Sequence, residues 1–250
     1  MRLVLLGDPV GHSLSPPIFR AAFAAAGVTG SSYEARRVDA AGLAAAMAEI
    51  QAGEIDGANV TMPHKRLAAR GCSDLDRDAA RAGAVNTLAR RDGLVIGWNT
   101  DILALRDALA GMPDGPVLVL GAGAAAAAAI VAAGSREQIV AARRPEAARA
   151  VSAAAIVGEW GRPVEGAIVV NATPLGMRGE ALPDRVLLAA FGLVDLAYGP
   201  TATPAVTAMR ERGAPVVDGI DVLVAQAAAS FTIWTGVTAP IEAMERAARG

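Results

Sequence analysis

The stretch Val117-Leu118-Val119-Leu120-Gly121-Ala122-Gly123-Ala124-Ala125-Ala126 decides the fold. Its first four residues are all apolar, which predicts a short strand buried on both faces of a parallel sheet. Two glycines then allow a tight turn, and the alanines favour a helix to about residue 133. In this context a G-x-G-x-x-G/A motif binds a dinucleotide pyrophosphate, although an ordinary strand–helix turn is the alternative. The predicted cofactor-binding residues are Gly121, Ala122, Gly123, Ala124 and Ala125.

The residues about 20 positions after this turn indicate which dinucleotide is bound. An NAD site usually has an acidic residue there, which accepts hydrogen bonds from the ribose hydroxyls. Here Arg143 and Arg144 occupy that place, and guanidinium groups suit the 2′-phosphate of NADP. The sequence therefore predicts NADP in preference to NAD. A solvated charge pair is the alternative, although cations are unfavourable at helix N-termini.

Outward from the turn, predicted strands and helices alternate along the rest of the 250-residue chain. Toward the C-terminus we expect strands at residues 138–142, 167–170, 193–196 and 215–217, and helices at 145–156, 203–212, 222–235 and 240–249. Toward the N-terminus we expect strands at 2–6, 33–38 and 58–61, a hairpin around residues 91–93, and helices from 15 onward and at 40–52, 65–70, 75–82 and 101–110. This alternation predicts βαβ units and an α/β fold with a parallel sheet.

Composition and charge exclude several classes of protein. The net charge is −2 and the arginines are scattered or paired, so we expect no basic face for nucleic acid. The single cysteine, Cys72, rules out a disulfide framework and is expected to be a packed hydrophobe in a reducing compartment. His12 and His64 lack ligand-spaced partners, so no metal site is expected. No apolar run suits a signal peptide or a membrane span, which predicts a soluble cytoplasmic protein without a membrane partner.

Two polar segments are candidates for ligand binding, but neither is decisive alone. Ser13 and Ser15 stand two residues apart at a strand-to-helix turn, where two hydroxyls can bind a carboxylate. Alternatively, Ser15 only caps the helix that Pro16 begins. Lys65 follows a predicted strand and Asp101 opens a predicted helix. A lone lysine on a turn is usually solvated, and an acid at a helix start is often a cap.

Seven short blocks occur in one order between residue 7 and about residue 236. They are G-D-P-V-G-H-S-L-S-P, N-V-T-M-P-H-K, G-A-V-N-T-L, G-W-N-T-D, G-A-G, N-A-T-P-L-G-M and V-A-Q-A-A. Together they closely resemble the shikimate dehydrogenase family. The resemblance implies an enzyme that uses NADP to reduce 3-dehydroshikimate reversibly to shikimate in aromatic amino-acid biosynthesis, as a monomer or homodimer.

The resemblance also implies a role for each matching residue and a division into domains. Lys65 and Asp101 correspond to the family's catalytic lysine and its aspartate partner. The substrate-binding positions are Ser13, Ser15, Thr61, Asn86, Tyr198 and Gln226. The cofactor-binding positions are those of the glycine turn together with Arg143, Arg144, Asn171, Thr173 and Gly219. Residues 1–100 plus 222–250 are implied to form a discontinuous substrate-binding domain, and 101–221 an NADP-binding Rossmann domain.

Three positions depart from the family's pattern. Phe19-Arg20 stands where the family has His-Asn, and the 2′-phosphate block keeps only Arg143-Arg144. Asp221 replaces a glycine near the expected nicotinamide contact at Gly219. These departures leave open a dehydrogenase for quinate or a related cyclitol carboxylate. A catalytically silent NADP-binding protein is a further alternative, against which the retention of the lysine and aspartate argues.

Overall fold

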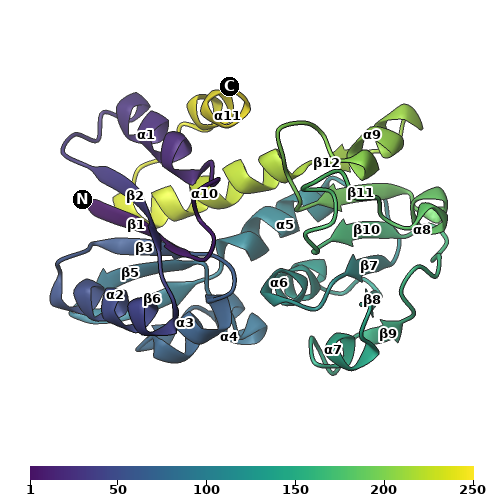
Figure 1. Ribbon diagram of the computed structural model, residues 1–250, viewed down its shortest axis with the longest axis horizontal. Coiled ribbons are helices and arrows are strands. Elements are labelled where there is room, and N and C mark those ends of the chain that lie inside the picture. Colours follow the sequence, from purple (N-terminus) through teal and green to yellow (C-terminus); the bar gives the residue numbers. More distant parts are fainter. The chain divides into compact units, whose positions relative to one another are not determined.

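The computed structural model of the chain describes residues 1–250, which divide into two compact units. Unit 1 contains Met1–Thr100 and Leu223–Gly250, and unit 2 contains Asp101–Val222. Each unit is built around one six-stranded sheet with helices beside it (Figure 1). The expected α/β class, with a parallel sheet in the second unit, is confirmed.

The sheet of unit 2 is entirely parallel. Its strands are β7 (Val117–Leu120), β8 (Gln138–Ala141), β9 (Ile156–Gly158), β10 (Ile168–Asn171), β11 (Gly192–Asp195) and β12 (Val216–Val217), in the spatial order β12-β11-β10-β7-β8-β9. From β7 the chain thus continues through β8 to β9 at one edge of the sheet. It then returns to form β10 on the other side of β7. In such doubly wound sheets, ligands bind outside the carboxyl ends of the strands where the order reverses. The expected strand at β7 is confirmed, and Gly121 follows it at this reversal.

The helices of unit 2 agree with the sequence except around residue 150 and at residues 184–189. They are α5 (Thr100–Ala110), whose first residue belongs to unit 1, α6 (Ala124–Ala133), α7 (Pro145–Arg149), α8 (Asp184–Ala189) and α9 (Pro204–Glu211). The expected helix at 145–156 is wrong, because α7 ends at Arg149 and residues 156–158 form β9. Only Ala148 of α7 is buried, so no apolar face extends the helix. Helix α8 was not expected.

The sheet of unit 1 is mixed. Its strands are β1 (Arg2–Gly7), β2 (Ser32–Arg37), β3 (Gly57–Val60), β4 (Asp74–Leu75), β5 (Thr87–Arg91) and β6 (Leu94–Trp98), in the spatial order β2-β1-β3-β5-β6-β4. Strands β1, β2 and β3 are parallel, whereas β5 runs antiparallel to β3 and β6. Asp92 and Gly93 both have positive φ, as a two-residue hairpin turn requires. The expected hairpin is confirmed.

The helices of unit 1 come from both ends of the chain. They are α1 (Ser15–Ala25), α2 (Ala40–Ala52), α3 (Lys65–Gly71), α4 (Arg77–Ala82), α10 (Gly219–Thr235) from Leu223 onward, and α11 (Ile241–Arg249). The C-terminal α11 packs against α1 (Figure 1). None of the helices combines the length and apolar character needed to cross a membrane.

The expected start of the first helix at residue 15 is confirmed, but the capping role of Ser15 and the expected start of the helix at 75–82 are wrong. Ser15 is the first residue of α1 rather than its cap, and Leu14 holds the capping position. The hydroxyl of Ser13 accepts the N–H of Ser15 at 3.2 Å. The helix expected at 75–82 begins at Arg77, because Asp76 caps it by accepting the N–H of Ala79 at 2.8 Å.

Candidate active site

The glycine turn after β7 packs closely against the loop after β10. Gly121 has φ +127°, and a Cβ there would lie 2.7 Å from the carbonyl oxygen of Ala172. Any side chain at Gly121 would therefore displace the loop after β10. Gly123 has open space at its Cβ position and precedes α6, which has no side-chain cap. The first N–H groups of α6, at Ala124 and Ala125, are thus left for an anion.

The loop after β10 is shaped by a buried polar network beside this turn. Asn171 is fully buried, and its Nδ2 donates to Asp195 Oδ1 at 2.7 Å and to the Leu175 carbonyl at 2.9 Å. Its Oδ1 accepts the backbone N–H of Thr173 at 3.1 Å and the hydroxyl of Thr173 at 2.6 Å. Desolvation raises the pKa of the buried Asp195 carboxyl. The side chain of Asn171 therefore orders the loop from within.

Two exposed arginines follow β8, the neighbour of β7. Arg143 and Arg144 both lie on the surface, and Arg144 immediately precedes α7. Strands β7 and β8 are parallel with Leu120 opposite Ala141, so their carboxyl ends share one sheet edge. The arginine pair and the glycine turn therefore follow adjacent strands at that edge.

Gly219 and Tyr198 are in close contact in unit 2. A Cβ at Gly219, the first residue of α10, would clash with the Ala197 carbonyl and lie 3.0 Å from Tyr198 Cβ. Tyr198 is half-buried, and desolvation raises the pKa of its phenol. Only glycine fits against this segment without displacing it.

The additional carboxylate at Asp221 has a structural explanation. Asp218 Oδ1 accepts the N–H groups of Ile220 at 3.0 Å and Asp221 at 3.1 Å. In return, Asp221 Oδ2 accepts the N–H of Asp218 at 3.0 Å. This reciprocal pattern is a capping box at the start of α10, where negative charge is favourable. The departure from the family's glycine therefore stabilises a helix N-terminus.

Four predicted site residues lie at one edge of the unit 1 sheet. Ser13 and Ser15 follow β1, and Thr61 and Lys65 follow β3, its parallel neighbour. A Cβ at Gly7, the last residue of β1, would clash with the side chain of Thr61. The loops after β1 and β3 are therefore in direct contact, and the structure brings the two predicted blocks together.

Lys65 is held by the backbone around it. It is the half-buried first residue of α3, and its carbonyl accepts the N–H of Val85 at 3.0 Å. His64 before it is buried, with Nε2 2.8 Å from the Val38 carbonyl oxygen. Asp101 is a buried residue of α5 in unit 2. Its pairing with Lys65 stays a prediction.

Asn86 and Gln226, predicted from separate blocks, meet in a buried polar cluster of unit 1. Asn86 Nδ2 donates to Gln226 Oε1 at 3.2 Å and to Thr100 Oγ1 at 2.9 Å. Asn86 Oδ1 accepts the N–H of Thr100 at 2.8 Å. The polar cluster comprises Asn59, Asn86, Thr87, Thr100, Gln226 and Ser230, all buried. Four of these residues were not predicted as site residues, although Asn59 is a conspicuous polar residue in the otherwise apolar strand β3.

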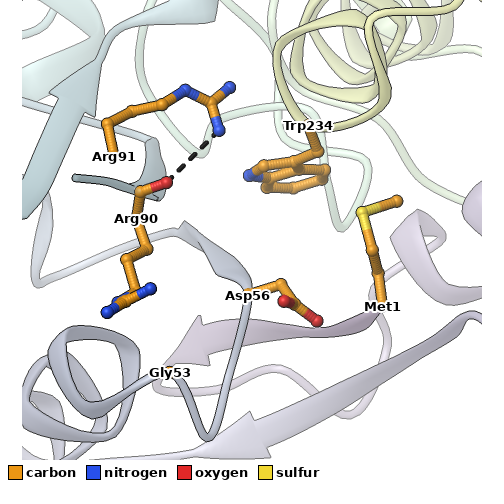
Figure 2. A pocket seen from close by; sticks show the side chains of 6 residues that line it. All are labelled: Met1, Gly53, Asp56, Arg90, Arg91 and Trp234. Atoms are coloured by element: carbon orange, nitrogen blue, oxygen red, sulfur yellow. Dashed lines mark hydrogen bonds between the residues drawn. The ribbon is translucent and has the colours of Figure 1, made fainter. Parts of the chain in front are cut away.

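A cavity of about 190 Å³ lies at the opposite edge of the unit 1 sheet (Figure 2). It is lined by Met1, Gly53, Asp56, Arg90, Arg91 and Trp234. These residues precede β1 and β3, end β5 or belong to α10, whereas the predicted site residues follow β1 and β3. Its charged groups already bond to the backbone, because Asp56 accepts the N–H of Arg2 and both lining arginines donate to carbonyls. This cavity is therefore not the candidate active site.

Cys72 is expected to be unreactive in the folded protein. It is half-buried, its thiol donates to the Ala68 carbonyl at 3.2 Å, and burial raises its pKa to about 12. Because only the thiolate is alkylated, iodoacetamide should react about a thousandfold more slowly at pH 8 than with the unfolded chain. Mass spectrometry with and without guanidinium chloride checks this, and equal rates would contradict a packed thiol.

Comparison with known proteins covers nearly the whole chain. The model of the shikimate dehydrogenase substrate binding domain matches residues 5–88, and that of the shikimate 5′-dehydrogenase C-terminal domain matches residues 219–249. The NADP(+) shikimate dehydrogenase of Moorella thermoacetica is 38% identical, covering 99% of this chain and 92% of the relative. That of an Exiguobacterium strain is 36% identical, covering 95% and 94%.

A solved structure extends this similarity to three dimensions. Shikimate 5-dehydrogenase from Thermus thermophilus, in complex with NADP(H) and shikimate, matches with a TM-score of 0.89 and 34% identity. The match covers 100% of this chain and 98% of that structure. The sequence blocks and the comparisons thus lead to the same family. The chain belongs to the shikimate dehydrogenase family.

Proposed function

We infer that this protein is an NADP-dependent shikimate dehydrogenase, which reversibly reduces 3-dehydroshikimate to shikimate in the shikimate pathway. The observation that carries this inference is the similarity to shikimate dehydrogenases over almost the full chain, one of them solved with NADP(H) and shikimate. The catalytic lysine and aspartate of the family's blocks are present as Lys65 and Asp101.

The proposed substrate site uses hydroxyl and amide groups to bind a carboxylated ring. Ser13 and Ser15 bind the carboxylate, and Thr61 and Asn86 bind ring hydroxyls. The Ser13 oxygen accepts a backbone N–H, which leaves its own proton to donate to a carboxylate. Tyr198 and Gln226 complete the substrate contacts.

The proposed cofactor site combines the glycine turn with the arginine pair. Residues 121–125 bind the pyrophosphate through free N–H groups, and Arg143 and Arg144 bind the 2′-phosphate. Asn171 and Thr173 contribute by ordering the adjoining loop, and Gly219, which packs against the Ala197 carbonyl, contacts the nicotinamide. When bound, NADPH supplies the hydride.

Lys65 is the proposed proton donor in the direction of reduction. Negative charge develops on the ring oxygen as the ketone is reduced, and a nearby ammonium stabilises it before giving up a proton. In oxidation the same amine accepts the hydroxyl proton. Asp101 orients the ammonium group and accepts a hydrogen bond from a substrate hydroxyl.

Initial rates with two substrates and two cofactors test this function. The purified protein is assayed with shikimate or quinate, each with NADP or NAD, by following the reduced cofactor. Shikimate with NADP should give the highest kcat/KM, because the similar proteins are NADP-dependent shikimate dehydrogenases and the arginine pair suits the 2′-phosphate. A preference for quinate would support the cyclitol alternative. NADP binding without any turnover would support the alternative of a catalytically silent NADP-binding protein.

We also propose a cytoplasmic location and a monomeric or homodimeric state. A single packed cysteine suits a reducing compartment, where thiols persist. Light scattering on the purified protein distinguishes the two oligomeric states, and fractionation of the source cells tests the location.

A further inference from the structure

Helix α10 carries two buried polar residues in an otherwise apolar stretch. Residues 223–231 read L-V-A-Q-A-A-A-S-F, in which Gln226 and Ser230 are the polar side chains. Because they stand four residues apart, both lie on the same face of the helix. Serine is a poorer helix former than alanine and is costly to bury without hydrogen bonds. The partners of the fully buried Ser230 therefore indicate its role.

The hydroxyl of Ser230 lies at the centre of the polar cluster. Its Oγ accepts from Asn59 Nδ2 at 3.1 Å, and it lies 2.8 Å from Thr87 Oγ1 and 3.1 Å from Thr100 Oγ1. It also lies 3.0 Å from the carbonyl oxygen of Gln226, to which it can donate. These partners belong to β3, β5, the first residue of α5 and α10. One hydroxyl group thus connects four segments of unit 1.

The hydroxyl neighbours of Ser230 lead to Asn86, the other proposed substrate residue of the polar cluster. Thr87 Oγ1 donates to Asn86 Oδ1 at 3.0 Å, and the N–H of Thr100 donates to the same oxygen at 2.8 Å. Asn86 Nδ2 in turn donates to Thr100 Oγ1 at 2.9 Å and to Gln226 Oε1 at 3.2 Å. Both ends of the Asn86 amide are therefore fixed by groups that also contact Ser230 or its helix.

We propose that Ser230 is a positioning residue that holds Asn86 and Gln226 in the geometry that binds substrate. The proposal rests on the function given above, in which both residues contact substrate. Ser230 acts only through its neighbours, because its side chain is fully buried among them. Loss of its hydroxyl therefore weakens substrate binding and leaves the proposed proton transfer at Lys65 intact.

The variant Ser230→Ala tests this role because alanine, which occupies the three preceding positions, keeps the helix. We expect KM for shikimate to rise about tenfold while kcat changes less than about threefold. KM for NADP should not change, because the proposed cofactor residues all belong to unit 2. A purely structural role would instead lower the melting temperature and leave both KM values as they were.

Two matched controls come from the same helix. Thr232→Ala also removes a hydroxyl that donates four residues back, to the Ala228 carbonyl at 3.1 Å, but Thr232 is exposed and outside the polar cluster. It should leave both KM values unchanged. Trp234→Phe removes a buried hydrogen bond from α10 to β5, the one that Nε1 donates to the Leu88 carbonyl at 2.9 Å. This second control should lose stability and keep the wild-type KM for shikimate.

Double variants test whether Ser230 acts through the polar cluster. Thr87→Val removes the neighbouring hydroxyl and keeps the shape of the side chain, so it should also raise KM for shikimate. Since both changes act on one network, their combined effect on KM should be smaller than the product of the single effects. Ser13→Ala acts on the carboxylate instead, so its effect should multiply with that of Ser230→Ala.

The outcomes separate this proposal from the proposed function. A wild-type protein that does not oxidise shikimate removes the function itself. An active wild type whose KM for shikimate is unchanged by Ser230→Ala overturns the positioning role, as does an equal rise of KM in Trp234→Phe. If Ser230→Ala does not fold, Thr87→Val decides the question from the strand side of the polar cluster, and an unchanged KM there overturns the proposal as well.

Discussion

Replacing Lys65 with alanine is expected to lower kcat for shikimate oxidation at least about 100-fold, the range that a general acid–base group contributes. KM for shikimate should change little, because the carboxylate and ring hydroxyls are bound by other side chains. The backbone of Lys65 is fixed by Val85 and by the buried His64, so the truncation should remove the amine without moving α3. Steady-state kinetics with saturating NADP measures the effect.

Arg66→Ala is the matched control for this loss. Arg66 follows Lys65 in α3, carries the same charge and is exposed. Its removal should leave kcat unchanged, which separates proton transfer from a general electrostatic effect of the helix. A Lys65→Ala protein that turns over near the wild-type rate would exclude Lys65 from the chemistry.

The strands and turns that position the site could be predicted because each has a characteristic local sequence, such as an apolar run or a glycine in a tight turn. The apolar run of β7 and the two glycines after it leave few alternatives to a strand and a tight turn. Asp92-Gly93 similarly determines the hairpin of unit 1, since both residues adopt positive φ. Local backbone requirements thus account for most of the confirmed elements.

The helix prediction at 145–156 is wrong because a run of alanines does not show which residues are buried. Residues 145–156 have high helix propensity, yet α7 ends at Arg149 and residues 156–158 join the sheet beside β8. Alanine favours helices without marking a buried face, so propensity alone did not show where tertiary pairing begins. The two-residue strand β4 was missed because so short a strand depends on its partner, β6.

The side chains that support the site could not be predicted from motifs. From the sequence Tyr33 is only a strand residue, whereas in the structure its hydroxyl donates to Asn59, 26 positions along the chain. Ser230 lies still farther from its partner Thr87. Such contacts follow from the packing of α1 and α10 on the sheet. The sequence shows that these residues are polar, but only the fold shows that they are buried together.

Replacing both Arg143 and Arg144 with alanine is expected to raise KM for NADP about 100-fold, since two charge-assisted hydrogen bonds contribute about 1.5 kcal/mol each. KM for NAD should stay within about twofold, because NAD lacks the 2′-phosphate that these groups bind. The preference for NADP should therefore fall by about the same factor. Parallel kinetics with the two cofactors measures this change directly.

Arg149→Ala provides the matched control, because Arg149 is an exposed arginine at the other end of α7. It should leave both cofactor KM values unchanged. Salt provides an independent check, since surface charge pairs weaken as ionic strength rises. KM for NADP should increase with added salt in the wild type and become insensitive to it in the double variant. An unchanged KM for NADP after removal of both arginines would mean that the pair is only solvated charge and that other residues select the cofactor.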